Sequence, residues 1–143
     1  MTDIRILSLP DGRDEELAAL WEACGLVASY NPPLEDIAFA RQSLDAEILV
    51  GIRDDRIVAS TLVGHDGHRG WLYYVAVSPD QQGTGLGAKI VAAAEEWLRE
   101  KGVRKVQLLV RPTNTKVLSF YEHLGYETSP VTVMQRWLID DPR

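Results

Sequence analysis

Three glycines within five residues separate a segment with strand character from a segment with helical character. Residues 75–89 read VAVSPDQQGTGLGAK, with glycine at positions 83, 85 and 87. A turn of this kind directs free backbone N–H groups and the positive end of the helix dipole towards one point. Pyrophosphate can bind there without a basic side chain, because glycine allows close approach and positive φ angles. The stretch therefore predicts a phosphate-binding loop.

Two common phosphate-binding patterns fit this loop poorly. A Walker loop requires Gly-Lys-Ser/Thr, whereas Ala88 and Lys89 follow the last glycine here. Residues 83–88 do satisfy the dinucleotide pattern G-x-G-x-x-A, and Arg111 could imitate a contact to a 2′-phosphate. A dinucleotide fold needs several parallel strands, however, and only one strand–helix–strand unit of this chain contains the pattern. Chain length therefore disfavours a dinucleotide site.

The elements that would position this loop follow from hydrophobic periodicity. Strands are predicted at residues 3–9, 46–53, 56–64, 71–78, 103–110 and 131–138, and helices at 14–25, 34–44, 84–101 and 114–124. The unit formed by 71–78, 84–101 and 103–110 should be parallel and right-handed. The other strands form antiparallel hairpins. These elements predict an α+β fold with a mixed, mostly antiparallel sheet and helices on both faces.

Apolar spacing also predicts which side chains face the core. The inward positions are Ile37, Phe39, Ala40 and Leu44 in one helix, and Leu86, Ile90, Val91, Ala94, Trp97 and Leu98 in another. Cys24 lies in the apolar pattern LAALWEACGL, which indicates a buried small side chain rather than a nucleophile.

Composition limits the remaining possibilities. A chain of 143 residues suits a single domain, residues 1–143. The net charge of -6 argues against binding to nucleic acid or to an anionic membrane. No apolar run approaches the ~20 residues of a membrane span, so a cytoplasmic protein is expected. One cysteine and three histidines give no zinc-ligand spacing, and no metal is expected.

Two motifs in the order expected for one family resemble the GNAT (GCN5-related) N-acetyltransferases. Residues 82–87 read Q-x-x-G-x-G, which resembles the pyrophosphate-binding motif of that family. Asn114, Val117, Tyr121 and Gly125 follow the spacing of the family's late N-x-x-A-x-x-x-Y-x-x-x-G motif, with valine where alanine is frequent. The run from Gly64 to Gly87 is also similar to a bacterial, YpeA-like subgroup. The resemblance covers nearly the whole chain.

The resemblance implies an acetyl-CoA site and assigns residues to it. The parallel strand pair is expected to splay, with pantetheine lying in the V and pairing with the backbone around residues 75–77. It implies cofactor contacts from Val75, Ala76, Val77, Gln82, Gly83, Thr84, Gly85, Leu86, Gly87, Ala88, Asn114 and Val117. Tyr121 matches the family's proton donor to the departing thiolate. Asn114 could equally be a helix N-cap, and one residue can do both.

The implied reaction is direct attack of a primary amine on the thioester within a ternary complex. A backbone N–H near residue 75 or 76 is the expected donor to the oxyanion. The base that deprotonates the amine stays open, with the candidates Tyr74, His65, His68 and Glu122. Tyr30, Asn31 and Tyr74 are expected on the acceptor side, although Tyr30 and Asn31 could also form a plain turn.

Two hypotheses remain for the function. The first is an acetyl-CoA-dependent N-acetyltransferase that acts on a small molecule or a peptide N-terminus. The alternative is a non-catalytic acyl-CoA-binding module of the same fold. The predicted strand at 131–138 could cover an edge of its own sheet or pair with a second copy, so a homodimer is one expected arrangement.

Overall fold

The computed structural model describes residues 3–140 and 142, and its contacts divide the chain into two compact units. Met1–Leu108 forms the first unit and Leu109–Arg143 the second. The first unit contains β1 (Arg5–Ser8), α1 (Asp14–Ala23), α2 (Pro33–Arg41), β2 (Ala46–Arg53), β3 (Arg56–His65), β4 (Gly70–Val77), the 3₁₀ turn η1 (Pro79–Gln81), α3 (Leu86–Glu100) and β5 (Val106–Leu108). The second contains α4 (Thr115–His123).

The five strands of the first unit form one mixed sheet in the order β1-β2-β3-β4-β5. The first four strands pair antiparallel, and β4 pairs with β5 in parallel. The parallel pair is joined through α3, as predicted for a βαβ crossover. This arrangement confirms the predicted α+β class and the mostly antiparallel sheet.

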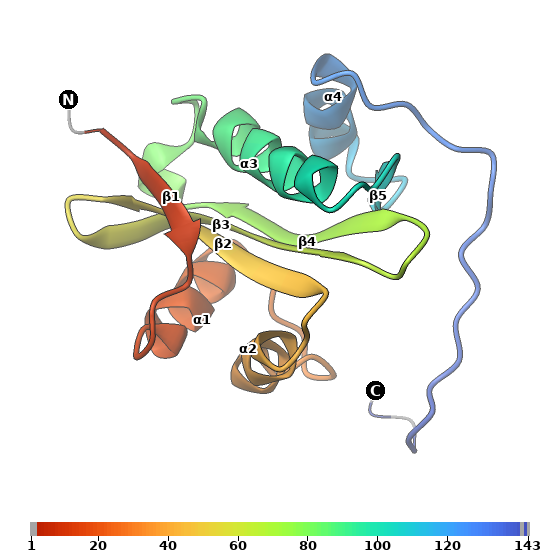
Figure 1. Cartoon of the computed structure of the whole chain (residues 1–143), viewed down its shortest axis with the longest axis horizontal. Helices are drawn as coiled ribbons and strands as arrows, with labels where there is room; N and C mark the ends of the chain where they lie inside the picture. The colour runs from red at the N-terminus through yellow and green to blue at the C-terminus, as the bar shows by residue number, and fades with distance from the viewer. Residues whose placement is uncertain (1–2, 141, 143) are drawn as a thin grey trace. The chain divides into compact units, whose positions relative to one another are not determined.

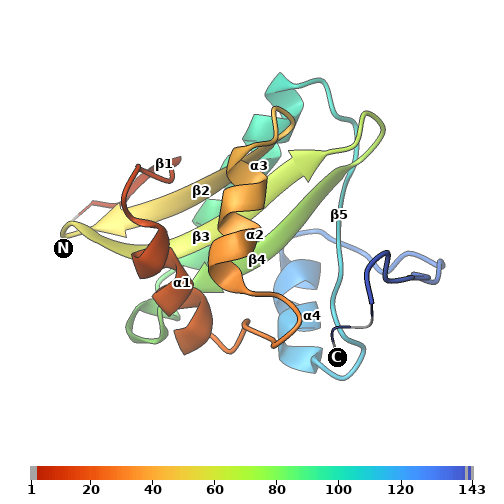
Figure 2. The same cartoon turned by 90° about the horizontal axis from the view of Figure 1, so that it is seen from below.

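Helices cover both faces of this sheet. Figures 1 and 2 show α1 and α2 on one face and α3 on the other. Under α1 and α2, Leu17, Trp21 and Ile37 are fully buried against strand residues such as Val50. The opposite face is covered by the inward side of α3, where Leu86, Ile90, Val91, Ala94 and Leu98 are buried as predicted.

The sequence prediction was wrong for two side chains near α2. Ile37 and Ala40 are buried as expected, but Phe39 is 79% exposed and Leu44 is 95% exposed. Phe39 lies between the two inward positions of the helix and points away from the sheet. The helix ends at Arg41, so Leu44 does not belong to it.

The predicted closing strand at residues 131–138 was also wrong. Within the described part of the second unit, these residues form no strand, and Val131, Val133, Met134 and Leu138 are exposed. Apolar residues of high β propensity make a stable strand only when another strand pairs with their backbone. The described residues of their own unit contain no strand that could do so.

Candidate functional site

The glycine loop connects η1 to the first turn of α3. Gly83 has φ 79° and Gly85 has φ 85°, both in the left-handed region that favours glycine. The first helical bond runs from Lys89 N to Gly85 O at 3.2 Å. The N–H groups of residues 85–88 precede that bond and therefore have no partner within the helix.

The amino-terminal turn of α3 is open to an anion. No side chain caps it, and its first turn contains no acidic residue. The nearby Thr84 hydroxyl donates to Gln81 O at 2.6 Å instead of accepting from the helix. Residues 82–85 are exposed, while Leu86 is buried and anchors the helix start. Free N–H groups and the helix dipole make this turn suited to a phosphate.

The chain ahead of the loop is tied to the β2–β3 hairpin by two arginines. Arg53 Nη1 donates to Gln81 Oε1 at 2.7 Å, and Arg56 Nη2 lies 2.7 Å from Asp80 Oδ2. The Ser78 hydroxyl and then Arg56 hold the pKa of Asp80 below its usual value. These contacts could not be predicted from the sequence, since residue spacing does not show which side chains of a distant hairpin reach a loop.

The strand that leads to the loop has an open edge, as expected of a splayed pair. The parallel pairing of β4 with β5 ends at Leu72 and Leu108, although β4 continues to Val77. Ser78 N donates to Val58 O, so the backbone of Ser78 faces β3. Because every second residue of a strand directs its N–H and C=O to the same side, the backbone of Ala76 also faces β3 and that of Val77 faces away from it. The Ala76 side chain is buried in the core.

A bulge lies in β4 at the start of this edge. Between the pairs Leu62–Tyr73 and Ser60–Ala76, two residues of β4, Tyr74 and Val75, lie opposite one residue of β3. A residue added in this way is left out of the ladder. The backbone of Val75 is thus available for another partner.

The Val77 carbonyl already has partners in the protein. It accepts from Cys24 Sγ at 3.2 Å and from Gln82 Nε2 at 3.3 Å. Burial raises the pKa of the Cys24 thiol, which keeps it a donor and agrees with the prediction that it is no nucleophile. The edge therefore presents the N–H and C=O of Val75 and the N–H of Val77 to a ligand.

Tyr74 is a poor candidate for the base. Its hydroxyl donates to Asp36 Oδ2 at 2.6 Å, and its ring stacks on Trp21. Burial, followed by the hydrogen bond to Asp36, raises the pKa of Tyr74 above its ordinary value. A phenol that stays protonated beside a carboxylate does not accept a proton near neutral pH.

The histidines of the β3–β4 turn belong to a structural turn. Asp66 Oδ1 accepts from His68 N and Arg69 N, and Asp66 Oδ2 accepts from Trp71 Nε1. His65 Nδ1 accepts from the N–H of Gly67. These hydrogen bonds account for the polar residues of the turn without a catalytic role.

Tyr30 and Asn31 lie in the connection between α1 and α2. Asn31 N donates to Ala28 O at 2.9 Å, and the same two residues form an isolated β-bridge. Both side chains are partly exposed. Tyr30 and Asn31 therefore form the predicted turn, and a turn at this place is compatible with a role on the acceptor side.

In the second unit, Asn114 caps α4. Its Oδ1 accepts from Val117 N at 3.3 Å, so the N-cap interpretation of this asparagine is correct. A cap uses one acceptor of the amide and leaves its NH₂ group able to donate to a ligand.

Tyr121 is a buried residue of the same helix. Its ring makes edge contacts with Phe120 at 5.0 Å and with Tyr126 at 5.5 Å between centroids. Burial raises the pKa of Tyr121 to about 12. The hydroxyl therefore stays protonated at neutral pH and can donate to a ligand.

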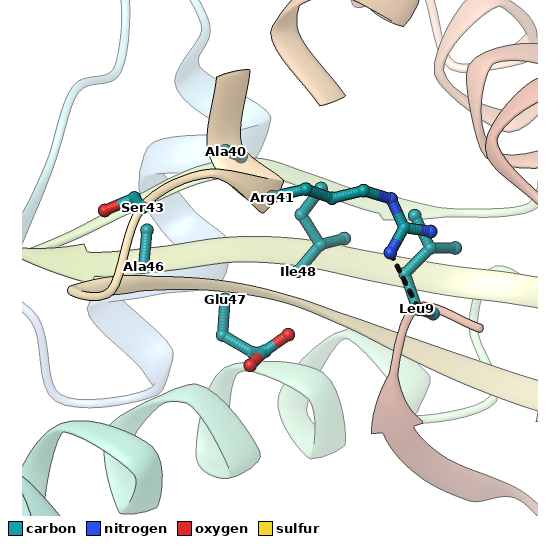
Figure 3. A pocket seen from close by; sticks show the side chains of 7 residues that line it. All are labelled: Leu9, Ala40, Arg41, Ser43, Ala46, Glu47 and Ile48. Carbon is teal, nitrogen blue, oxygen red and sulfur yellow. Dashed lines mark hydrogen bonds between the residues drawn. The ribbon is translucent and has the colours of Figure 1, made fainter. Parts of the chain in front are cut away.

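A shallow pocket of about 130 Å³ lies elsewhere in the first unit (Figure 3). Arg41 lines it and donates to Leu9 O, to Pro10 O and, at 2.6 Å, to Asp14 Oδ1. These contacts join the end of α2 to the segment between β1 and α1. With its guanidinium so occupied, Arg41 has a structural role, and the pocket contains none of the predicted site residues.

Comparison with known proteins decides the family. Residues 14–126 match the acetyltransferase (GNAT) family. The chain belongs to this family. A Yersinia pestis (strain Pestoides F) relative named acetyltransferase is 37% identical over 140 residues, with 97% of both chains covered. GNAT proteins are acyltransferases, so the match supports an enzyme rather than a structural protein.

Solved structures of GNAT proteins show the same fold. The aminoglycoside N-acetyltransferase AAC(6′)-Iy in complex with CoA has a TM-score of 0.84 at 16% identity, with 97% of each chain covered. The ribosomal-protein-S18-alanine N-acetyltransferase from Escherichia coli has a TM-score of 0.78 at 20% identity, covering 89% of this chain and 79% of that one. At these identities the likeness concerns the fold.

The described residues contain no group of three or more potential metal ligands close enough to share an ion. They also contain no helix with the length and apolar character needed to cross a membrane.

Proposed function

We propose that this protein is an acetyl-CoA-dependent N-acetyltransferase that transfers the acetyl group directly to a primary amine. The observation that carries the proposal is an uncapped helix start, preceded by two left-handed glycines, directly after a strand with an open edge. Pyrophosphate fits the free N–H groups of residues 85–88. Pantetheine amides fit the unpaired N–H and C=O of Val75 and the unpaired N–H of Val77.

The residues proposed to hold the cofactor are those of the two motifs and the strand edge. Gln82, Gly83, Thr84, Gly85, Leu86, Gly87 and Ala88 surround the pyrophosphate. The segment Val75, Ala76 and Val77 lies along pantetheine, with the backbone of Val75 and Val77 facing it. Asn114 and Val117 contribute from α4. On this proposal the two units act as one acetyltransferase domain.

The chemistry requires one bond to form and one to break. The amine nitrogen attacks the thioester carbonyl carbon, the C–N bond forms, and the C–S bond breaks as the thiolate leaves. A backbone N–H in the bulge region stabilises the oxyanion. Tyr121, whose phenol is protonated at neutral pH, donates to the departing thiolate. The proton lost by the amine passes to solvent or to a base that is still to be assigned.

The acceptor class is a primary amine on a small molecule or on a peptide N-terminus. The family contains both kinds, as the names of the two structural neighbours illustrate. A net charge of -6 favours a cationic acceptor. Because the reaction consumes acetyl-CoA, we propose that the protein works in the cytoplasm. The proposed reaction needs only acetyl-CoA and the amine, and no nucleic acid or membrane partner.

We also propose that the segment 131–138 pairs with a second copy of the chain. Its apolar side chains are exposed, and an unpaired segment of high β propensity gains backbone hydrogen bonds when another strand joins it. Light scattering on the full chain should give a dimer mass. A monomer mass at micromolar concentration would refute this arrangement.

The alternative function is a non-catalytic acyl-CoA-binding module. It shares the loop and the strand edge but needs no buried phenol. Calorimetric titration with acetyl-CoA, combined with a thiol-release assay on a panel of amines, separates the two. The enzyme proposal requires that acetyl-CoA binds and that at least one amine causes release of the CoA thiol. Tight binding without release on any amine, and no effect of Tyr121→Phe, would leave the binding module as the function.

A further inference from the structure

Tyr74 has an unusual backbone conformation at the point where the cofactor edge begins. Its φ is 53°, in a region that bulky side chains avoid unless their surroundings hold them there. It lies in the bulge of β4, two residues after the parallel pairing with β5 ends at Leu72. A bulge bends a strand and increases its twist, so the geometry of the following residues depends on this one.

Neighbouring elements hold Tyr74 from three sides. Its ring stacks on Trp21 of α1, with centroids 3.7 Å apart and planes 4° from parallel. Its hydroxyl donates to Asp36 of α2 at 2.6 Å. Its carbonyl accepts from the hydroxyl of Ser60 of β3 at 2.9 Å.

These contacts are themselves fixed in the core. Trp21 Nε1 donates to Ser60 Oγ at 3.0 Å, so the residue under the ring also orients the hydroxyl that binds the Tyr74 carbonyl. Trp21 and Ser60 are fully buried. The three partners of Tyr74 thus form a clamp, defined here as Trp21, Ser60 and Asp36.

We propose that Tyr74 is a positioning residue for cofactor binding, held in its left-handed conformation by the clamp of Trp21, Ser60 and Asp36. The conformation keeps the bulge in place, and the bulge keeps the backbone of Val75 out of the ladder with β3. This role rests on the proposed function, because the ligand of the open edge is the pantetheine of acetyl-CoA.

The clamp sets the fraction of molecules in which the edge of β4 is open, and this fraction sets the affinity for acetyl-CoA. If the clamp is weakened, residue 74 relaxes to a negative φ in a fraction of molecules, and Val75 no longer presents its N–H and C=O to the ligand. The apparent affinity then falls in proportion to the fraction that keeps the open edge.

Paired tyrosine variants test this inference. Tyr74→Phe keeps the ring on Trp21 but removes the donor to Asp36, and acetyl-CoA should bind about tenfold more weakly by calorimetry. Tyr73→Phe is the matched control, because this neighbouring tyrosine is 44% exposed, and the hydroxyl that donates to Asp36 is that of Tyr74. The affinity of Tyr73→Phe for acetyl-CoA should stay within about twofold of that of the wild type.

Asp36→Ala removes the same hydrogen bond from its other side. It should weaken acetyl-CoA binding as much as Tyr74→Phe does, and the double variant should show no additional loss, since both changes break one interaction. Hydrogen exchange of the β4 peptide without cofactor gives a second readout. Exchange should be faster in Tyr74→Phe and unchanged in Tyr73→Phe.

The outcomes separate this inference from the proposed function. Wild-type affinity and wild-type exchange in Tyr74→Phe, or losses that add in the double variant, would overturn the positioning role alone. A fall in melting temperature with unchanged affinity would show a merely structural role and would overturn it too. If the wild-type protein itself does not bind acetyl-CoA, the proposed function fails, and the role of Tyr74 fails with it.

Discussion

Cys24 donates from Sγ to the Val77 carbonyl at 3.2 Å and thereby connects the end of α1 to the open edge of β4. The chain has no other cysteine. This thiol is therefore a specific probe of the strand on which we place pantetheine.

We predict slow alkylation of Cys24. Burial raises its pKa, so at about pH 8 a smaller fraction is thiolate than for an ordinary cysteine with a pKa of about 8.5. The rate with iodoacetamide should be several-fold below that of glutathione, and saturating CoA should lower it further. Labelling as fast as glutathione, with no protection by CoA, would contradict the assigned environment of Cys24.

Gly85→Val should abolish acetyl-CoA binding. A β-branched residue at φ 85° is strained by about 1–2 kcal/mol, and relief of that strain would change the backbone that leads into the free N–H groups of α3. Gly12→Val is the control, because Gly12 has φ 82° in a turn outside the loop and likewise has open space around its Cβ position. Both variants should lose similar stability in urea, and only Gly85→Val should lose the cofactor. Equal affinities in the two variants would refute the loop assignment.

Asn114 should have two separable roles. Asn114→Ala removes the cap of α4 and should cost about 1 kcal/mol of unfolding free energy, together with cofactor affinity. Asn114→Ser restores a capping oxygen but has no amide NH₂ group. Stability should therefore recover in the serine variant while the affinity for acetyl-CoA stays low. Recovery of both would show that the asparagine acts only as a cap.

Tyr121→Phe should lower kcat without weakening acetyl-CoA binding. The phenol is proposed to donate to the departing thiolate, and loss of a general acid costs typically about a hundredfold or more. Tyr73→Phe provides a tyrosine control in the same assay. An unchanged kcat in Tyr121→Phe would remove Tyr121 from the mechanism while leaving the cofactor site intact.

The ionisation of Tyr121 predicts a pH dependence. Burial raises its pKa to about 12 in the folded protein, above its value in the unfolded chain. The stability that this group contributes is therefore complete below about pH 10 and is lost as the pH rises through about 12. The tyrosinate absorbance of the wild type should contain a component near the upper value that Tyr121→Phe lacks. A Tyr121 component at about pH 10 would contradict its burial.

The sequence predicted best the elements whose signals are local. Residues 46–53 form a strand with the predicted bounds, and the buried face of α3 matches its apolar spacing except at Trp97, which is only partly buried. Hydrophobic periodicity reports these features directly, because core-facing residues repeat with the period of the element. The glycine pattern likewise predicted the turn at Gly83 and Gly85, where positive φ favours glycine.

Features that depend on distant residues could not be predicted in this way. Phe39 and Leu44 are apolar but exposed, since the end of α2 and its rotation depend on packing against the sheet. Residues 131–138 have the composition of a strand, but a strand also requires a partner, which their own sequence does not specify.

The sequence alone predicted the family, the glycine loop and the candidate residues Asn114 and Tyr121, because motif spacing and periodicity are properties of neighbouring residues. Only the tertiary structure decided that Tyr74 is clamped by Trp21, Ser60 and Asp36, and that Cys24 and Gln82 occupy the Val77 carbonyl. These contacts join residues 5 to 53 positions apart, and they form because the sheet brings helices and strands together around one bulge.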